Sequence, residues 1–171
     1  MNLENKEIES RGKILALSLK IEDCLNRIIY NFFIPESEDK KTRNIYLQSF
    51  IIPQSFAQKV NIYKEILKTE RYSKKVIKKL KTNAEVLYID DFESFEKIVK
   101  QNLAEIISTR NYVAHGIDIS NAFLTLEQDE VVLMNKLNLL KISNETINNF
   151  STLVKKTYSL MNLTNGSLKE K

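Results

Sequence analysis

The chain has 171 residues, of which 43% are hydrophobic and 28% charged, so it can bury a sizeable core and is too apolar for a disordered protein. Its formal net charge of +4 at pH 7 permits an anionic partner such as RNA without requiring one. The single cysteine and single histidine exclude an internal disulfide and the usual zinc spacings, and 3 scattered glycines exclude a phosphate-binding glycine loop. We therefore expect one domain over residues 1–171 that needs no metal and no cofactor.

The first predicted helix runs from about Lys6 to Phe33. Its apolar residues recur at helical spacing and form one stripe: Ile14, Leu17, Ile21, Leu25, Ile28 and Phe32. Cys24 lies three residues after Ile21 on this stripe, which favours a small core residue over a nucleophile. The acidic start of the chain does not resemble a signal peptide, and no apolar stretch approaches membrane-spanning length. We expect a cytoplasmic protein that does not bind a membrane.

Pro35 begins a polar segment that we expect to be an exposed loop. A short helical piece follows at Thr42 to Ile51. The next helix has a core face made of Phe56, Val60, Tyr63 and Leu67. Another helix is predicted from Arg71 to Tyr88, and its lysines between positions 74 and 81 indicate a solvated face, with RNA contact as the alternative.

The helix that leads to His115 begins after two good N-terminal residues, Asp90 and Asp91. Its apolar residues are Phe95, Val99, Leu103, Ile106 and Ile107. Gly116 is a natural residue to end it. We call the predicted helix up to His115 the motif helix.

The pattern changes after the motif helix. Phe123–Leu126 and Val131–Met134 read as two short strands and predict a β-hairpin at about residues 122–142. Ser143 or Asn144 then caps a last helix that ends near Gly166. The sequence thus predicts a mainly α fold, a helical bundle of about five helices with a small β-hairpin insertion after the motif helix.

The end of the motif helix carries the most unusual residues of the chain. Arg110 lies seven residues after Leu103 and points almost in the same direction, while Asn111 and His115 drift toward the edge of that face. We therefore expect the core-facing surface to turn polar in its last turns. A solitary buried arginine costs several kcal/mol, so it must meet an acid, open into a cleft or face a second subunit.

The run from Arg110 to Gly116, Arg-Asn-Tyr-Val-Ala-His-Gly near the end of a helix, resembles the HEPN superfamily. The signature of that family is an arginine, a polar residue and then a histidine, which Arg110, Asn111 and His115 match with four residues between arginine and histidine. The segment from Ser55 to Val60 also resembles a helix common in such proteins.

This resemblance implies a metal-independent endoribonuclease of toxin–antitoxin or antiviral defence systems that works as a homodimer. Arg110, Asn111 and His115 are then the catalytic residues, and Tyr112 and Lys59 the residues that bind the substrate RNA. An antitoxin or a nucleotidyltransferase-like protein is the expected protein partner. A tyrosine that one toxin branch has two residues after the histidine is replaced here by Ile117.

These residue types fit the cleavage of RNA by its own 2′-hydroxyl. Histidine titrates near neutral pH and serves as the base or the acid, and arginine holds phosphate oxygens. Asn111 orients the imidazole or binds the phosphate. Because each chain has one histidine, a mechanism with two imidazoles needs two chains.

Each residue also has a structural interpretation. His115 fits a capping residue at a helix C-terminus, Tyr112 fits core packing, and Arg110 fits the partner of a buried acid such as Glu22 or Asp23. The alternative functions are a catalytically silent HEPN-like module that binds RNA, nucleotide or a partner protein, and a helical scaffold that pairs with a nucleotidyltransferase-like neighbour.

Overall fold

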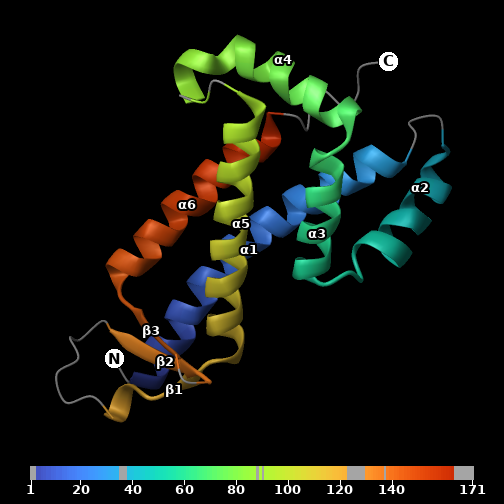
Figure 1. Ribbon diagram of the computed structural model, residues 1–171. Helices are drawn as coiled ribbons and strands as arrows, with labels where there is room; N and C mark the ends of the chain where they lie inside the picture. Colours follow the sequence, from blue (N-terminus) through green and yellow to red (C-terminus); the bar gives the residue numbers. More distant parts are fainter. Residues whose placement is uncertain are drawn as a thin grey trace. The chain divides into compact units, whose positions relative to one another are not determined.

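The computed structural model describes residues 3–34, 38–87, 89, 91–122, 130–136 and 138–163. This part of the chain contains six α-helices and a three-stranded antiparallel sheet (Figure 1), which confirms the mainly α fold. The helices are α1 (Leu3–Phe33), α2 (Lys40–Tyr46), α3 (Phe56–Leu67), α4 (Glu70–Leu87), α5 (Phe92–His115) and α6 (Asn144–Asn162). A π-type turn, η1 (Leu47–Ile51), continues α2 and completes the short helical piece predicted there.

The chain divides into two compact units. The first combines residues 1–20 with residues 104–156, and the second combines residues 21–103 with residues 157–171. Helices α1, α5 and α6 therefore contribute one end to each unit. The expectation of a single domain over residues 1–171 stays a prediction.

The second unit has the core that helical periodicity predicts. All four residues of the predicted face of α3 are buried: Phe56, Val60, Tyr63 and Leu67. A capping box begins this helix, in which the Ser55 hydroxyl accepts from the Gln58 N–H and the Gln58 side chain accepts from the Ser55 N–H. On α1, Ile21, Leu25 and Ile28 are buried, which confirms that part of the predicted stripe.

Helix α5 starts where the sequence predicts. The Asp91 carboxylate accepts hydrogen bonds from the Ser94 N–H at 2.7 Å and from the Ser94 hydroxyl at 3.0 Å. These bonds favour the ionised form and hold the pKa of Asp91 below its ordinary value. Asp90, the other predicted N-terminal residue, lies outside the described residues.

The first unit contains the sheet, in which β2 (Val131–Asn135) is the central strand. It pairs antiparallel with β1 (Ile117–Asp118) on one side and with β3 (Asn138–Ile142) on the other. Val131, Val132, Leu133 and Ile142 are buried. The turn η2 (Ser120–Ala122) extends the β1 side, since the Ser120 hydroxyl accepts from the Val132 N–H and the Ile119 N–H donates to the Val132 carbonyl.

The predicted hairpin is right in its position but wrong in its strand pairing. The predicted strand Val131–Met134 is present as β2, whereas its predicted partner Phe123–Leu126 lies outside the described residues. β2 instead forms its hairpin with the segment that follows it, with Asn135 opposite Asn138. The chain reverses at Lys136, whose φ of 57° is the left-handed conformation that two-residue hairpin turns use.

The last helix begins at the first of the two predicted caps. The Ser143 hydroxyl accepts a hydrogen bond from the Thr146 N–H at 3.2 Å, and α6 follows with Phe150, Val154 and Leu160 buried. Helix α6 ends at Asn162, and Gly166 lies outside the described residues.

Candidate functional site at the end of α5

Arg110 lies in line with buried apolar residues of α5. Leu103, Ile106 and Val113 are fully buried, and Arg110 stands between the last two at the alternating three- and four-residue spacing of one helix face. Its own side chain is only half-buried. The predicted direction of Arg110 is therefore confirmed, and the residue is partly accessible to solvent.

The expectation that the core-facing surface itself turns polar is wrong. Ile106 and Val113 keep that face apolar through the last turns of α5. Asn111 and His115 are exposed. They lie four residues apart, on the same side of the helix, so the amide and the imidazole are both open to a ligand.

Two of the three motif side chains, those of Arg110 and Asn111, lie close together. One Nη atom of Arg110 lies 3.5 Å from the Asn111 Oδ1 atom, which is the long end of a hydrogen bond. Arg110 and His115 are separated by about 140° around the helix axis, so an arginine bound to a phosphate next to His115 must extend along the helix surface. The arrangement offers one guanidinium, one amide and one imidazole on an accessible surface.

A second arginine, Arg11 of α1, holds the end of the motif helix. Its two terminal nitrogens donate to the carbonyls of Val113 at 2.5 Å and Gly116 at 2.7 Å. Glu7, one turn earlier on α1, accepts from the same guanidinium at 2.6 Å. The last carbonyls of a helix have no partner within it, so Arg11 supplies their donors and places positive charge at the negative end of the helix dipole.

Gly116 ends α5 because of close packing, and its φ is not positive. A Cβ atom at this position would lie 2.5 Å from the Tyr112 carbonyl oxygen and 3.1 Å from the Leu133 Cβ. The Gly116 N–H also donates to the Tyr112 carbonyl at 2.7 Å. The glycine therefore lets β1 begin directly beneath the last turn of the motif helix.

The two residues predicted to bind substrate lie in different surroundings. Tyr112 is half-buried on α5, next to Asn111. Lys59 of α3 is 1% exposed, and its ammonium donates to the Glu22 carboxylate at 2.7 Å and to the Ile52 carbonyl at 3.2 Å. This placement corrects the predicted RNA-binding role of Lys59, because a buried ammonium held by two acceptors has no surface for a phosphate.

The same contact gives Glu22, one of the acids expected to pair with Arg110, a different partner. Glu22 was an expected acid for that arginine, and its carboxylate binds Lys59 instead. Asp23, the other expected acid, is exposed.

Cys24 is a core residue, as the sequence predicts. It is fully buried, and its Sγ atom lies 3.7 Å from the Asn162 Oδ1 atom. Burial raises the pKa of this thiol from its ordinary value to about 11. The thiolate needed for nucleophilic chemistry is therefore scarce at neutral pH.

Sequence reasoning missed Arg11, the residue that holds the end of α5. Glu7 and Arg11 are spaced one turn apart, a pattern that by itself indicates a common surface ion pair. The contacts to Val113 and Gly116 join residues more than a hundred positions apart. Nothing in the local pattern distinguishes such an arginine from a solvated one.

Comparisons of this chain with models of known families, with curated proteins and with solved structures found no match. Among the described residues, no group of three or more His, Cys, Asp or Glu side chains is placed to hold a metal ion. None of the described helices has the length and apolar character needed to cross a bilayer.

Proposed function

We propose that this protein is a metal-independent endoribonuclease of the toxin or phage-defence type, related to the HEPN superfamily and active as a homodimer in the cytoplasm. The observation that carries the proposal is the placement of the motif. Asn111 and His115 are exposed on one side of α5, and the Arg110 guanidinium lies 3.5 Å from the Asn111 amide oxygen. An antitoxin or a nucleotidyltransferase-like protein is the protein partner that the resemblance implies.

The reaction transfers a phosphoryl group within the RNA. The 2′-oxygen attacks the adjacent phosphorus, the bond from phosphorus to the 5′-oxygen breaks, and a 2′,3′-cyclic phosphate and a 5′-hydroxyl end result. One imidazole takes the proton of the 2′-hydroxyl, and another gives a proton to the leaving 5′-oxygen. Since the chain has one histidine, the two imidazoles are His115 of each protomer.

The other motif residues stabilise charge and geometry. Arg110 donates to the non-bridging phosphate oxygens, where negative charge grows in the transition state. Asn111, which lies beside this guanidinium, orients it or donates its own amide to the phosphate. The accessible position of the motif supports this assignment because a phosphate must approach all three groups from solvent.

The proposal predicts that His115→Ala and Arg110→Ala each lower RNA cleavage by about a hundredfold or more, the usual size of acid–base and electrostatic catalysis. Cleavage of a labelled RNA is followed in excess chelator, and the new ends are identified by mass. Arg71→Ala, which removes an exposed arginine of α4, is the control and should cleave as the parent does. His115→Ala should leave the free energy of unfolding within about 0.5 kcal/mol, as exposed side chains do.

Three results would contradict the proposal. The first is cleavage at the parent rate by both motif variants. The second is activity that chelator abolishes and magnesium restores. The third is a parent protein that binds RNA without cleaving it, which would favour the alternative of a silent HEPN-like binding module.

A further inference from the structure

The second unit contains a hollow of about 880 Å³ between the end of α1 and α2. We call it the α1–α2 hollow; its lining residues are Tyr30, Glu38, Lys40, Lys41, Arg43, Asn44 and Leu47. Three of these side chains are cations and one is an anion. The hollow is open to solvent, and its volume is far above what a water or a simple ion needs.

The cations of this hollow differ from four other lysines of the described residues, each of which has a glutamate partner close by in the sequence. Lys13, Lys68, Lys74 and Lys100 each bind a glutamate one turn away on the same helix. In the described part of the chain, Lys40, Lys41 and Arg43 form no ion pair. The nearby carboxylate of Asp39 instead caps α2, accepting from the Thr42 hydroxyl and from the Lys41 and Thr42 N–H groups.

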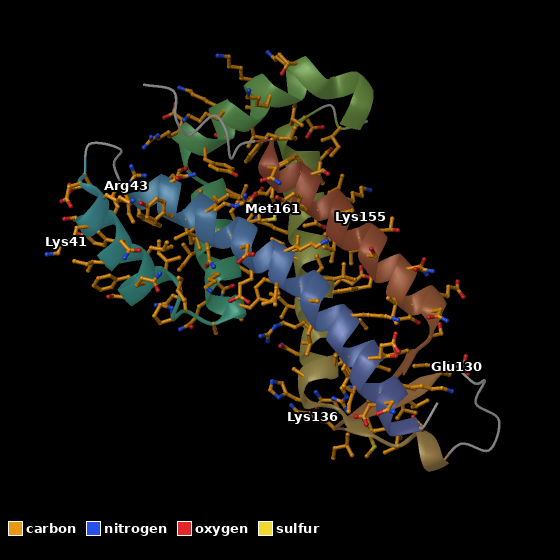
Figure 2. The ribbon with its side chains drawn as sticks, turned by 180° about the vertical axis from the view of Figure 1, so that it is seen from behind. Lys41, Arg43, Glu130, Lys136, Lys155 and Met161 are labelled. Carbon is orange, nitrogen blue, oxygen red and sulfur yellow. The ribbon has the colours of Figure 1, made fainter. Side chains whose placement is uncertain are left out.

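Arg43 is held in a fixed orientation at the wall of the hollow. Its Nε atom donates to the Tyr30 hydroxyl at 2.7 Å, and its guanidinium carbon lies 5.2 Å from the centre of the Tyr30 ring. A guanidinium fixed through Nε and one ring face keeps its terminal nitrogens for another acceptor. Figure 2 shows Arg43 close to α1 and Lys41 nearby on α2.

The cations of α2 contribute nothing to the core. None of the residues of this helix is buried, and Lys40 and Lys41 are exposed. Their like charges repel one another, and Glu38 is the single carboxylate among the lining residues, so a bound anion relieves the repulsion. A multivalent anion such as a phosphate group is a ligand that suits a hollow lined by three cationic side chains.

From the unpaired cations, the fixed guanidinium and the volume, we infer that the α1–α2 hollow binds a nucleotide unit through its phosphate. The phosphate belongs to an RNA chain or to a free nucleotide. Arg43 and the two lysines hold the phosphate oxygens, and Asn44 and Glu38 are polar neighbours for the rest of the unit. This goes beyond the proposed function, because binding here requires none of the motif residues of α5.

The test measures binding of a short fluorescein-labelled oligouridylate by anisotropy, in the full chain carrying His115→Ala so that the RNA stays intact. The double variant Lys40→Gln/Lys41→Gln should raise the Kd about tenfold and lower the slope of log K against log salt by about 1.4, the value for two lost single-strand contacts. Tyr30→Phe, which removes the hydroxyl that holds Arg43, should weaken binding while keeping the ring.

The matched control is Lys68→Gln/Lys74→Gln. It removes the same charge from two exposed lysines of the same unit that are paired with Glu65 and Glu70. It should change the Kd less than about twofold, since exposed pairs contribute little. Equal effects of the two double variants would overturn the inference, because binding would then follow net charge alone.

Competition identifies the source of the phosphate. Displacement of the oligouridylate by ATP or uridine monophosphate at similar concentrations assigns the hollow to a free nucleotide, and displacement only by unlabelled oligouridylate assigns it to RNA. If neither the oligouridylate nor a free nucleotide binds to the protein, the inference is wrong. If the parent cleaves RNA and Lys40→Gln/Lys41→Gln binds RNA as tightly as the parent does, the hollow is not a binding site but the proposed function still stands. The two proposals can therefore fail separately.

Discussion

At the residue scale, Lys59 and Glu22 form a largely buried ion pair in the second unit. The lysine side chain is 2% exposed and the glutamate side chain 20%. Taking two charges out of water costs free energy that their attraction and the added bond to the Ile52 carbonyl offset. Loss of either partner leaves a poorly solvated charge, so this pair ties α3 to α1 with a large penalty for breaking it.

We predict that Lys59→Met lowers the free energy of unfolding by about 3 kcal/mol, the low end for breaking a buried pair, because Glu22 keeps some solvent. The double variant Glu22→Gln/Lys59→Met should recover much of this loss, since it leaves no unpaired charge. Urea unfolding measures all three proteins. Lys68→Met is the control and should cost less than about 1 kcal/mol, since its pair with Glu65 is exposed. Equal stability of Lys59→Met and the parent would contradict this account.

At the element scale, the geometry of the candidate site depends on how α5 ends. The motif occupies the last turns of the helix, where the backbone carbonyls lack intrahelical donors. Arg11 supplies donors to Val113 and Gly116, and Gly116 allows the sheet to begin at once. The position of His115 is therefore set by a residue of α1 and by packing against β2, as much as by its own helix.

We predict that Arg11→Gln destabilises the protein by about 2–4 kcal/mol, since it removes charge-assisted hydrogen bonds from two carbonyls. Cleavage should fall as well, because the last turn of α5 frays and His115 loses its position. Thermal melts, hydrogen exchange of the amides near His115 and the cleavage assay measure these effects. Lys13→Gln, which removes an exposed pair with Glu9 on the same helix, is the control. Unchanged exchange at the end of α5 would show that Arg11 does not hold it.

The elements that sequence predicts well are those with local signals. Helical periodicity gives the core face of α3, and side-chain caps give the starts of α5 and α6. The sheet is harder to predict from sequence, because the local residue pattern does not show which strands pair with each other. β2 has apolar residues that fit either neighbour, and its turn at Lys136 lacks the usual Asn-Gly signal.

Some features of the candidate site can likewise be predicted from local sequence, and others cannot. Helix geometry predicts that Arg110 points in nearly the same direction as Leu103 and that Asn111 and His115 lie on one side of the helix. The structure agrees with both predictions. Geometry alone does not predict that Val113 restores the apolar face, nor that Lys59 is buried against Glu22. Those outcomes depend on which elements pack together, and burial of a lysine is rare enough that exposure is the natural expectation.

At the scale of the whole molecule, the count of histidines limits the mechanism. Each chain brings one imidazole and one motif, so an acid and a base that are both histidines require two chains. A closed two-fold dimer places equivalent motifs opposite one another when the end of α5 lies in its interface. The dimer is thus a condition of the proposed reaction as well as a property that is measured separately.

We predict that light scattering at micromolar concentration gives twice the chain mass of 19.9 kDa. Subunit exchange between the parent and His115→Ala then tests whether both imidazoles serve one site. In an equal mixture, random pairing leaves about one quarter of the dimers with two histidines, so activity at fixed total protein should fall to about one quarter of the parent value. Independent sites would instead keep about one half, because each intact chain would act alone. An active protein that stays strictly monomeric, or a mixture that keeps one half of the activity, would contradict a site built from two histidines.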